Sequence, residues 1–191
     1  MKHKAIFLDR DGTINVEQPQ YLTSIEKLDI MDEVYDAIRL IQENHFKSIV
    51  VTNQSCVGRG LLEETLLHKI HETMRHRLAE KKAYLDSIYY CPHRPDEGCM
   101  CRKPKTGMFE QAVREHQIDL KQSYMIGDKE FDILAGKNAG LKTVLVLTGG
   151  GENTLKYFSK KIQPDFIAPN ILEAVKWILN SQSHSPKNQK I

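Results

Sequence analysis

Short apolar segments rich in β-branched residues alternate with segments of helical periodicity along most of the chain. The apolar segments predict buried strands at residues 5–8, 48–51, 87–90, 123–126, 143–147 and 165–167. The helical segments are residues 33–43, 63–79, 107–116, 130–139 and 170–179. Parallel strands need a crossover connection, and helical crossovers cover both faces of the sheet. The alternation therefore predicts an α/β fold in three layers, a Rossmann-like parallel sheet between helices.

Length and composition fit one such domain. The chain has 191 residues, of which 40% are hydrophobic and 27% charged, with a formal net charge of +2. We predict a single domain over residues 1–180, without a large cap domain, and a flexible polar tail over residues 181–191. The nearly balanced charge argues against a nucleic-acid partner, and no apolar run approaches the ~18 residues of a membrane span. Because we find no recognisable signal peptide, we expect a cytoplasmic protein. We also expect it to be a monomer.

Acidic residues come directly after the first predicted strand, in the run Asp9-Arg10-Asp11-Gly12-Thr13. Alternate side chains of an extended chain point the same way, so Asp9 and Asp11 share one side, about 7 Å apart by Cα. Two carboxylates in this position can divide nucleophilic and acid/base roles, or hold a cation. A solvated turn would explain an isolated Asp-x-Asp, but the preceding buried strand favours a site.

The second predicted strand leads into Thr52-Asn53-Gln54-Ser55. Its hydroxyls and backbone N–H groups could bind phosphate oxygens, and an ordinary helix N-cap and turn is the equal alternative. The carboxyl ends of parallel strands meet at one sheet edge, which places this segment near Asp9 and Asp11.

The fourth predicted strand leads into Gly127-Asp128-Lys129. Asp128 could join Asp9 and Asp11, and three clustered carboxylates repel one another unless a cation lies among them. Oxygen ligands alone suit Mg²⁺. Asp132, one helical turn further on, either orients Lys129 or a metal-bound water, or is an acid in the first turn of a helix.

Three of the four cysteines fall close together, in Cys91-x-His93 and Cys99-x-Cys101. One imidazole and three thiolates fit tetrahedral Zn²⁺, and four protein ligands indicate a structural ion. The alternative is a set of unligated loop residues. We predict a zinc-binding loop over residues 91–105, which would fix the basic residues that follow Cys101.

Three further features carry less weight. Cys56 is interpreted as a small buried residue and His71 as a core or surface residue of its helix. The run Gly149-Gly150-Gly151 lacks the Lys-Ser/Thr that follows in a phosphate-binding P-loop, and we interpret it as a turn.

These segments, in this order and with Lys103 between the second and fourth strands, resemble the four motifs of the haloacid dehalogenase superfamily. Two further stretches, 89–93 and 99–104, are similar to those of the phosphatases that act on the 7-phosphate of D-glycero-D-manno-heptose 1,7-bisphosphate. Histidinol-phosphate phosphatases share most of these segments and are the alternative. A phospho-acceptor signalling domain is a rival from another class, but it would need an acceptor Asp after the third strand, where Cys91 stands.

The resemblance implies a mechanism. Asp9 is the nucleophile that forms an aspartyl-phosphate, and Asp11 is the general acid and base. Mg²⁺ is held by the carboxylates of Asp9 and Asp128 and the main-chain carbonyl of Asp11, while Thr52 and Lys103 neutralise the phosphoryl group. The substrate is a small phosphorylated sugar. The residues implied to bind it are Arg10, Glu17, Gln18, Gln20, Asn53, Gln54, Ser55, Arg102 and Lys129.

Overall fold

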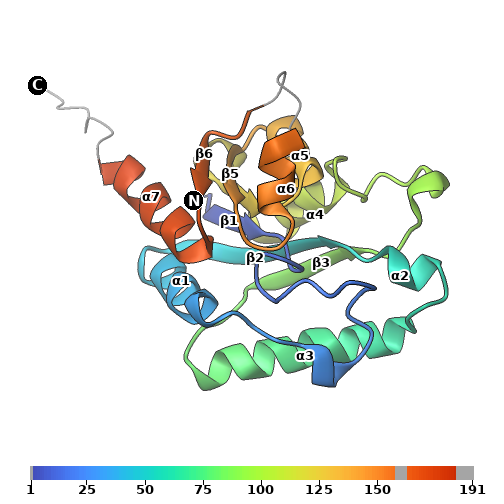
Figure 1. The fold of residues 1–191 in the computed structure, drawn as a ribbon. Coiled ribbons are helices and arrows are strands. Elements are labelled where there is room, and N and C mark those ends of the chain that lie inside the picture. Colours follow the sequence, from blue (N-terminus) through green and yellow to red (C-terminus); the bar gives the residue numbers. More distant parts are fainter. Residues whose placement is uncertain (1, 158–162, 184–191) are drawn as a thin grey trace, which may run out of the picture.

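The computed structural model describes residues 2–157 and 163–183, and its centre is a sheet of six parallel strands (Figure 1). The strand order is β3-β2-β1-β4-β5-β6. The bounds are β1 (Lys4–Leu8), β2 (Phe46–Asn53), β3 (Ser87–Cys91), β4 (Tyr124–Gly127), β5 (Lys142–Val146) and β6 (Phe166–Ala168). The predicted parallel α/β fold is confirmed.

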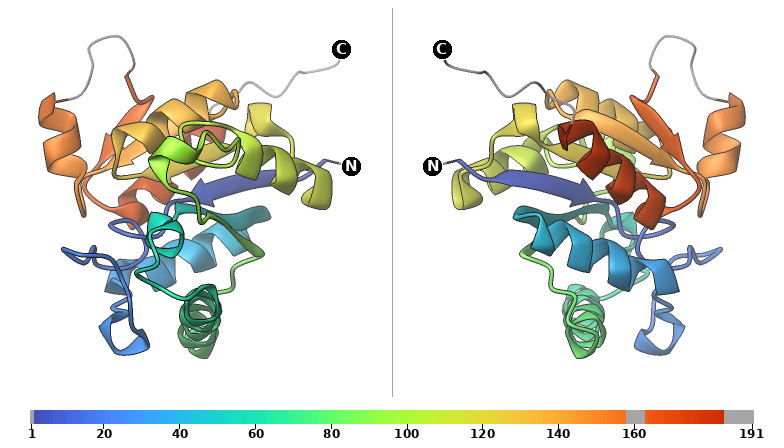
Figure 2. Two further views of the ribbon diagram at one scale, coloured as in Figure 1. Left: turned by 90° about the vertical axis from the view of Figure 1, so that its right-hand side faces the viewer. Right: turned by 90° about the vertical axis from the view of Figure 1, so that its left-hand side faces the viewer.

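Helices cover both faces of this sheet, which gives the predicted three layers (Figure 2). On one face lie α1 (Asp32–Glu43), α3 (Glu64–Glu80) and α7 (Ile171–Ser183), and on the other lie α4 (Gly107–His116) and α5 (Glu130–Asn138). Each face has its own cluster of buried apolar side chains. Within β1, Ile6 and Leu8 belong to the first cluster and Ala5 and Phe7 to the second, as the alternation of a strand requires.

Two short helices were not predicted: α2 (Ser55–Gly58) and α6 (Gly151–Tyr157). The second begins inside the glycine run that we interpreted as a turn. Short 3-10 helices occupy Ile25–Lys27, Pro95–Glu97 and Leu120–Gln122. Residues 9–31, between β1 and α1, hold only the first of these rather than a cap domain.

The tail that we predicted over residues 181–191 overlaps the end of α7. Residues 181–183 continue α7, and the rest of that tail, 184–191, lies outside the described residues. The end of α7 is anchored because Lys4 Nζ donates to Gln182 Oε1 at 2.8 Å, which ties the helix to the start of β1. The side-chain hydroxyl of Ser181 also donates to the Ile178 carbonyl at 2.7 Å, within the last turn.

The topology places the candidate residues at one edge of the sheet. From β1 the chain builds outward to β2 and β3, then returns to the other side of β1 for β4, β5 and β6. Leu8, the last residue of β1, is in register with Val50 of β2 and Ile126 of β4. The residues that follow these three strands therefore meet at a topological switch point, where α/β sheets bind ligands.

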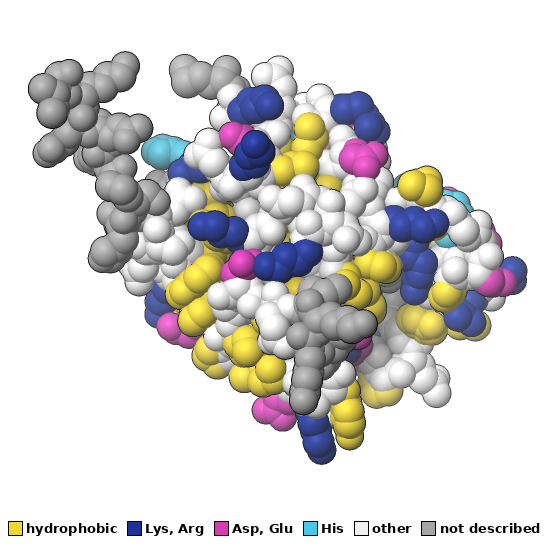
Figure 3. All heavy atoms as spheres, turned by 90° about the horizontal axis from the view of Figure 1, so that it is seen from above, with side chains coloured by type: hydrophobic (Ala, Val, Ile, Leu, Met, Phe, Trp, Pro, Cys, Tyr) yellow, Lys and Arg dark blue, Asp and Glu magenta, His cyan; other side chains and the backbone are white. Residues whose placement is uncertain are grey.

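No helix in the described part of the chain is long and apolar enough to cross a membrane. On the face shown in Figure 3, Lys and Arg side chains are scattered among acidic and uncharged ones rather than gathered into one basic surface.

The contact between Phe7 and Phe109 tests the packing of α4 on the sheet. Both side chains are fully buried, and their rings meet edge to face with centroids 4.9 Å apart. Phe109→Ala should lower the free energy of unfolding by about 3–5 kcal/mol, because it leaves a cavity, whereas Phe109→Leu should cost about 1.5 kcal/mol. Urea denaturation measures both. Tyr157→Ala, at a position 76% exposed, serves as the control, and an equal loss there would contradict the assignment of Phe109 to the core.

Candidate active site

Three acids converge at the carboxyl ends of β1 and β4. Oxygens of Asp9, Asp128 and Asp132 lie within 4.8 Å of one another, and all three side chains are buried. The backbone N–H of Asp9 donates to the Ile126 carbonyl at 2.9 Å, which extends the β1–β4 pairing to the first acid. We predicted a cluster of Asp9, Asp11 and Asp128; the structure brings in the side chain of Asp132 instead of that of Asp11.

The ammonium of Lys103 lies among these carboxylates. Its Nζ is 2.7 Å from Asp9 Oδ1, 2.6 Å from Asp132 Oδ1 and 2.6 Å from the carbonyl oxygen of Val51. Burial acts to lower the pKa of Lys103, but Asp132 and Asp9 outweigh it and raise that pKa above its ordinary value. Lys103 is therefore a fixed positive charge beside Asp9.

Asn53 holds the backbone of Lys103 in place. Its Oδ1 accepts the Lys103 N–H at 3.0 Å, and its Nδ2 donates to the Lys103 carbonyl at 3.1 Å. The side-chain amide thus pairs with both backbone polar groups of one residue, and the end of β2 fixes a lysine that is 50 positions away in sequence.

Asp128 has the features of a metal ligand. Its Oδ2 accepts the Gly150 N–H at 2.7 Å and lies 3.2 Å from Lys129 Nζ, whereas its Oδ1 is buried with no hydrogen-bond partner in the described part of the chain. Burial and the charge of Asp9 raise the pKa of Asp128 to about 7. Excess negative charge and an unpaired carboxylate oxygen are what a bound cation relieves, and the all-oxygen donor set fits Mg²⁺.

The carboxylate of Asp11 turns toward a separate set of partners. Arg10 Nη2 donates to its Oδ2 at 2.7 Å, Gln54 Nε2 to the same oxygen at 2.9 Å, and Asn15 Nδ2 to its Oδ1 at 3.1 Å. Burial acts to raise the pKa of Asp11, but the charge of Arg10 and these hydrogen bonds lower it below its ordinary value. Asp11 is therefore held as an oriented anion beside Asp9.

Arg10 and Gln54, which we predicted to bind substrate, are buried and do not line the pocket. The Arg10 side chain is only 1% exposed, because it is enclosed by Asp11, Gln54 and His71. Gln54 is buried as well and also donates to Thr52 Oγ1 at 2.8 Å. Both residues lie beneath the floor of the pocket and orient Asp11 and Thr52.

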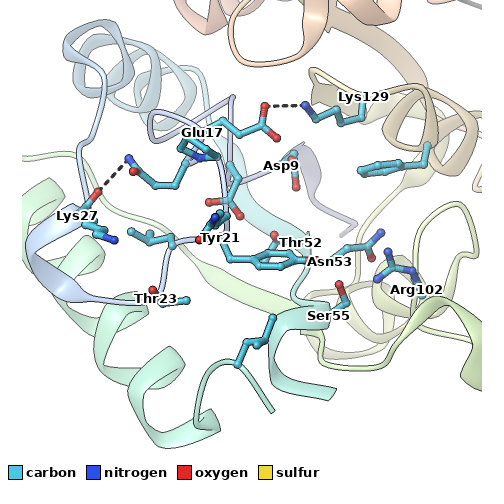
Figure 4. Close-up of a pocket in the computed structure, with 17 residues that line it drawn as sticks. Asp9, Glu17, Tyr21, Thr23, Lys27, Thr52, Asn53, Ser55, Arg102 and Lys129 are labelled. Carbon is cyan, nitrogen blue, oxygen red and sulfur yellow. Dashed lines mark hydrogen bonds and ion pairs between the residues drawn. The ribbon is translucent and has the colours of Figure 1, made fainter. Parts of the chain in front are cut away.

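A cavity of about 740 Å³ opens over the acids (Figure 4). Asp9, Asp11 and Thr52 form its floor. Predicted substrate-binding residues that line it are Glu17, Gln18, Gln20, Asn53, Ser55, Arg102 and Lys129; it is also lined by Pro19, Tyr21, Leu22, Thr23, Lys27, Leu61 and Phe131. On one side Lys129 Nζ pairs with Glu17 Oε2 at 2.7 Å, and Arg102 lies near Ser55 and Asn53 on another.

The cysteine cluster assembles as predicted. One ligand atom each of Cys91, His93, Cys99 and Cys101 lies within 4.8 Å of the others. Cys91 Sγ is 3.5 Å from Cys99 Sγ, and His93 Nδ1 is 3.3 Å from Cys101 Sγ. These thiols and this imidazole converge on one point, which is compatible with a zinc site. The loop leads directly into Arg102, whose Nη1 donates to the His93 carbonyl at 3.4 Å.

Sequence reasoning gave no definite role to three residues that contact the site residues. The sequence left Asp132 open between a helix cap and a functional acid; in the structure its Oδ2 accepts the Lys129 N–H at 3.0 Å, as a cap does, while its Oδ1 pairs with Lys103. His71 was treated as an ordinary helix residue, but its Nε2 lies 3.1 Å from Arg10 Nη1. Gly150, treated as part of a turn, donates to Asp128. The Gly-Asp-x-x-x-Asp spacing of residues 127–132 is the sequence signal for Asp132, and we find no local sequence signal for the role of His71.

Comparison with known proteins agrees with this geometry. Residues 100–174 match the family model described as "HAD-hyrolase-like". Curated relatives include the D-glycero-beta-D-manno-heptose-1,7-bisphosphate 7-phosphatases of Haemophilus ducreyi and Escherichia coli K12. The first is 44% identical over 157 residues, which are 78% of this chain and 86% of the relative. The second is 40% identical over 191 residues, which cover 96% of this chain and 92% of the relative. The chain belongs to the haloacid dehalogenase (HAD) family.

A solved structure of this HAD group is similar over nearly its full length. The D,D-heptose 1,7-bisphosphate phosphatase of B. bronchiseptica, complexed with magnesium and phosphate, superimposes with a TM-score of 0.86 at 31% identity. The match covers 93% of this chain and 99% of that chain.

His71 gives a pH test of the network beneath the floor. Burial and then the charge of Arg10 lower the pKa of His71 from 6.5 to about 3, so the folded protein keeps this imidazole neutral. Below about pH 6.5 the unfolded chain binds a proton that the folded chain does not. His71 should therefore lower the free energy of unfolding by about 1.4 kcal/mol per pH unit as the pH falls from about 6 to 4.

Urea denaturation at several pH values measures this contribution. His71→Gln should show a shallower acid loss of stability than the parent protein, because the glutamine oxygen can accept from Arg10 and does not titrate. His76→Gln is the matched control, since the His76 side chain is 83% exposed. Equal pH dependence in the parent and His71→Gln proteins would contradict a buried neutral imidazole.

Proposed function

We propose that this protein is a Mg²⁺-dependent phosphatase that removes the 7-phosphate of D-glycero-β-D-manno-heptose 1,7-bisphosphate. The observation that carries the proposal is the position of Asp9, a carboxylate at the floor of an open pocket, beside the Lys103 ammonium and the Asp128 carboxylate. The relatives at about 40% identity bear the name of this activity, including the β anomer.

The chemistry proceeds in two displacements. A carboxylate oxygen of Asp9 attacks phosphorus, the bond from phosphorus to the sugar oxygen breaks, and Asp11 gives that oxygen a proton. Asp11 then takes a proton from water, whose oxygen attacks the aspartyl-phosphate and releases inorganic phosphate and free Asp9. The anionic state of Asp11 in the free protein suits the second displacement; for the first, the carboxylate takes up a proton before the sugar oxygen leaves.

Charge neutralisation accompanies both displacements. Asp9, Asp128 and the main-chain carbonyl of Asp11 are the residues that would hold Mg²⁺, which when bound neutralises charge on the phosphoryl oxygens. Lys103 supplies a second, permanent positive charge, and the Thr52 hydroxyl a hydrogen bond. Asp132 keeps the Lys103 ammonium in place.

Selectivity arises at the walls of the pocket. A substrate with two phosphates needs cations away from the reaction centre as well as at it, and Arg102 and Lys129 are such cations. Polar side chains of the same walls, Glu17, Gln18, Gln20, Asn53 and Ser55, are available to the sugar hydroxyls. The product would be a heptose 1-phosphate, a precursor of activated heptose for lipopolysaccharide. We propose that the domain of residues 1–180 works as a cytoplasmic monomer.

Steady-state kinetics test the proposal. The purified protein with Mg²⁺ should hydrolyse heptose 1,7-bisphosphate with a higher kcat/KM than histidinol phosphate, and the β anomer faster than the α anomer. Asp9→Asn should lower kcat on the order of 10⁴-fold or more while leaving the fold intact by circular dichroism. A higher kcat/KM on histidinol phosphate would contradict the substrate, and a stable phosphoprotein without turnover would favour the signalling alternative.

The cysteine cluster is proposed to hold one structural Zn²⁺. Zinc would fix residues 91–101 and, through them, Arg102 at the pocket wall and Lys103, which pairs with Asp9 of the floor. Metal analysis should find about one zinc per chain. Cys101→Ser should lose the zinc and lower both thermal stability and kcat/KM, whereas Cys56→Ser, at a buried cysteine outside the cluster, should keep it. A zinc content that is unchanged in Cys101→Ser would contradict this site.

A further inference from the structure

The loop that follows β5 crosses directly over the turns that carry the site acids. Thr148 Oγ1 donates to the Gly12 carbonyl at 2.6 Å, and the Gly150 N–H donates to Asp128 Oδ2 at 2.7 Å. Gly12 comes directly after Asp11, so this loop, residues 148–151, joins the turn after β1 to the turn after β4. These contacts are made to the site itself and not to the apolar core.

Gly149 occupies a position that excludes every side chain. Its φ is +54°, in the left-handed region, and a Cβ there would lie 2.5 Å from Asp128 Oδ2 and 2.5 Å from the Gly12 Cα. Both distances are below any real Cβ contact, and the second atom is backbone and cannot swing aside. An alanine at this position would therefore push Asp128 and the turn after β1 apart.

Gly150 is constrained by a different neighbour. A Cβ at this position would lie 2.0 Å from Lys129 Nζ and 3.0 Å from its Cε, so the lysine side chain lies across the bare glycine. In that position Nζ lies 2.7 Å from Glu17 Oε2 and 3.2 Å from Asp128 Oδ2. Because a lysine end is flexible, an alanine at 150 would displace Lys129 rather than the backbone.

We propose that Gly149 and Gly150 are positioning residues with separate tasks: Gly149 sets the Asp128 carboxylate for the metal, and Gly150 sets the Lys129 ammonium for the substrate. The proposal rests on the proposed function for the identity of the substrate. It predicts that two neighbouring glycines, changed in the same way, damage two different properties of the enzyme.

Three single variants separate these tasks. Gly149→Ala should weaken Mg²⁺ binding to the metal-free protein by about tenfold or more, because a metal ligand loses its support. Calorimetry measures this affinity.

Gly150→Ala should raise KM for the heptose bisphosphate by about tenfold, while the affinity for Mg²⁺ stays within about threefold of the parent value. Gly140→Ala is the control: its φ is +79° and a Cβ there would meet nothing within 4 Å, so it carries the backbone strain alone.

A double-mutant cycle tests whether Gly150 acts through Lys129. Lys129→Met should raise KM by itself, and adding Gly150→Ala should then have no further effect, because the displaced group is already gone. A role in folding alone would instead lower thermal stability in both backgrounds and leave KM unchanged.

The outcomes that overturn the proposal are distinct from those that overturn the proposed function. Parent-like Mg²⁺ affinity in Gly149→Ala, an equal loss in Gly140→Ala, or an undiminished effect of Gly150→Ala in the Lys129→Met background would each refute it. Failure of the parent protein to hydrolyse the bisphosphate would refute the proposed substrate instead. The calorimetric comparison would then still decide the role of Gly149, and the KM comparison would use the phosphate ester that the parent does hydrolyse.

Discussion

The candidate site depends on one buried ammonium. Three carboxylates crowded at a sheet edge repel one another, and the cost of burying their charges grows as water is excluded. Lys103 offsets part of that cost because its Nζ contacts Asp9, Asp132 and the Val51 carbonyl at 2.6–2.7 Å. Burial, reinforced by the charges of Asp9 and Asp128, still raises the pKa of Asp132 above its ordinary value. Lys103 therefore does not balance the cluster completely, and a divalent cation on the Asp9–Asp128 side would offset the remaining negative charge.

Lys103 reaches this position through a loop, and the molecule restrains that loop from several directions. Asn53 at the end of β2 binds both backbone polar groups of Lys103, the cysteine cluster lies directly before it, and α4 packs against the sheet soon after it. Ordered elements on both sides leave the lysine little freedom. The Lys103 ammonium is therefore held in a fixed position although it lies on a loop, and a fixed charge is what the electrostatic catalysis of the proposed function requires.

The strands, the main helices and the acids at the strand ends were predictable because they depend on local pattern: buried parallel strands read as apolar runs, and topology brings their carboxyl ends together. Contacts between residues that are far apart in the sequence could not be predicted in this way. Arg10 looks like a substrate ligand in the sequence, yet it lies under the floor because His71 and Gln54 enclose it. Gly149 and Gly150 look like a turn, since nothing local reveals that Asp128 and Lys129 lie against them.

The floor and the walls of the pocket differ in the elements that carry them and in the exposure of their side chains. The floor lies at the ends of β1 and β2, and in the proposed function it acts on the phosphoryl group, which every phosphate monoester has. Much of the wall comes from residues 17–23, between β1 and α1, and it includes exposed side chains such as Tyr21 and Leu61, which are available to the rest of a ligand. One ion pair, Lys129 with Glu17, joins the two, since Lys129 also contacts Asp128. The position of this one ammonium is therefore set by a residue of the wall, Glu17, and by a residue of the acid cluster, Asp128.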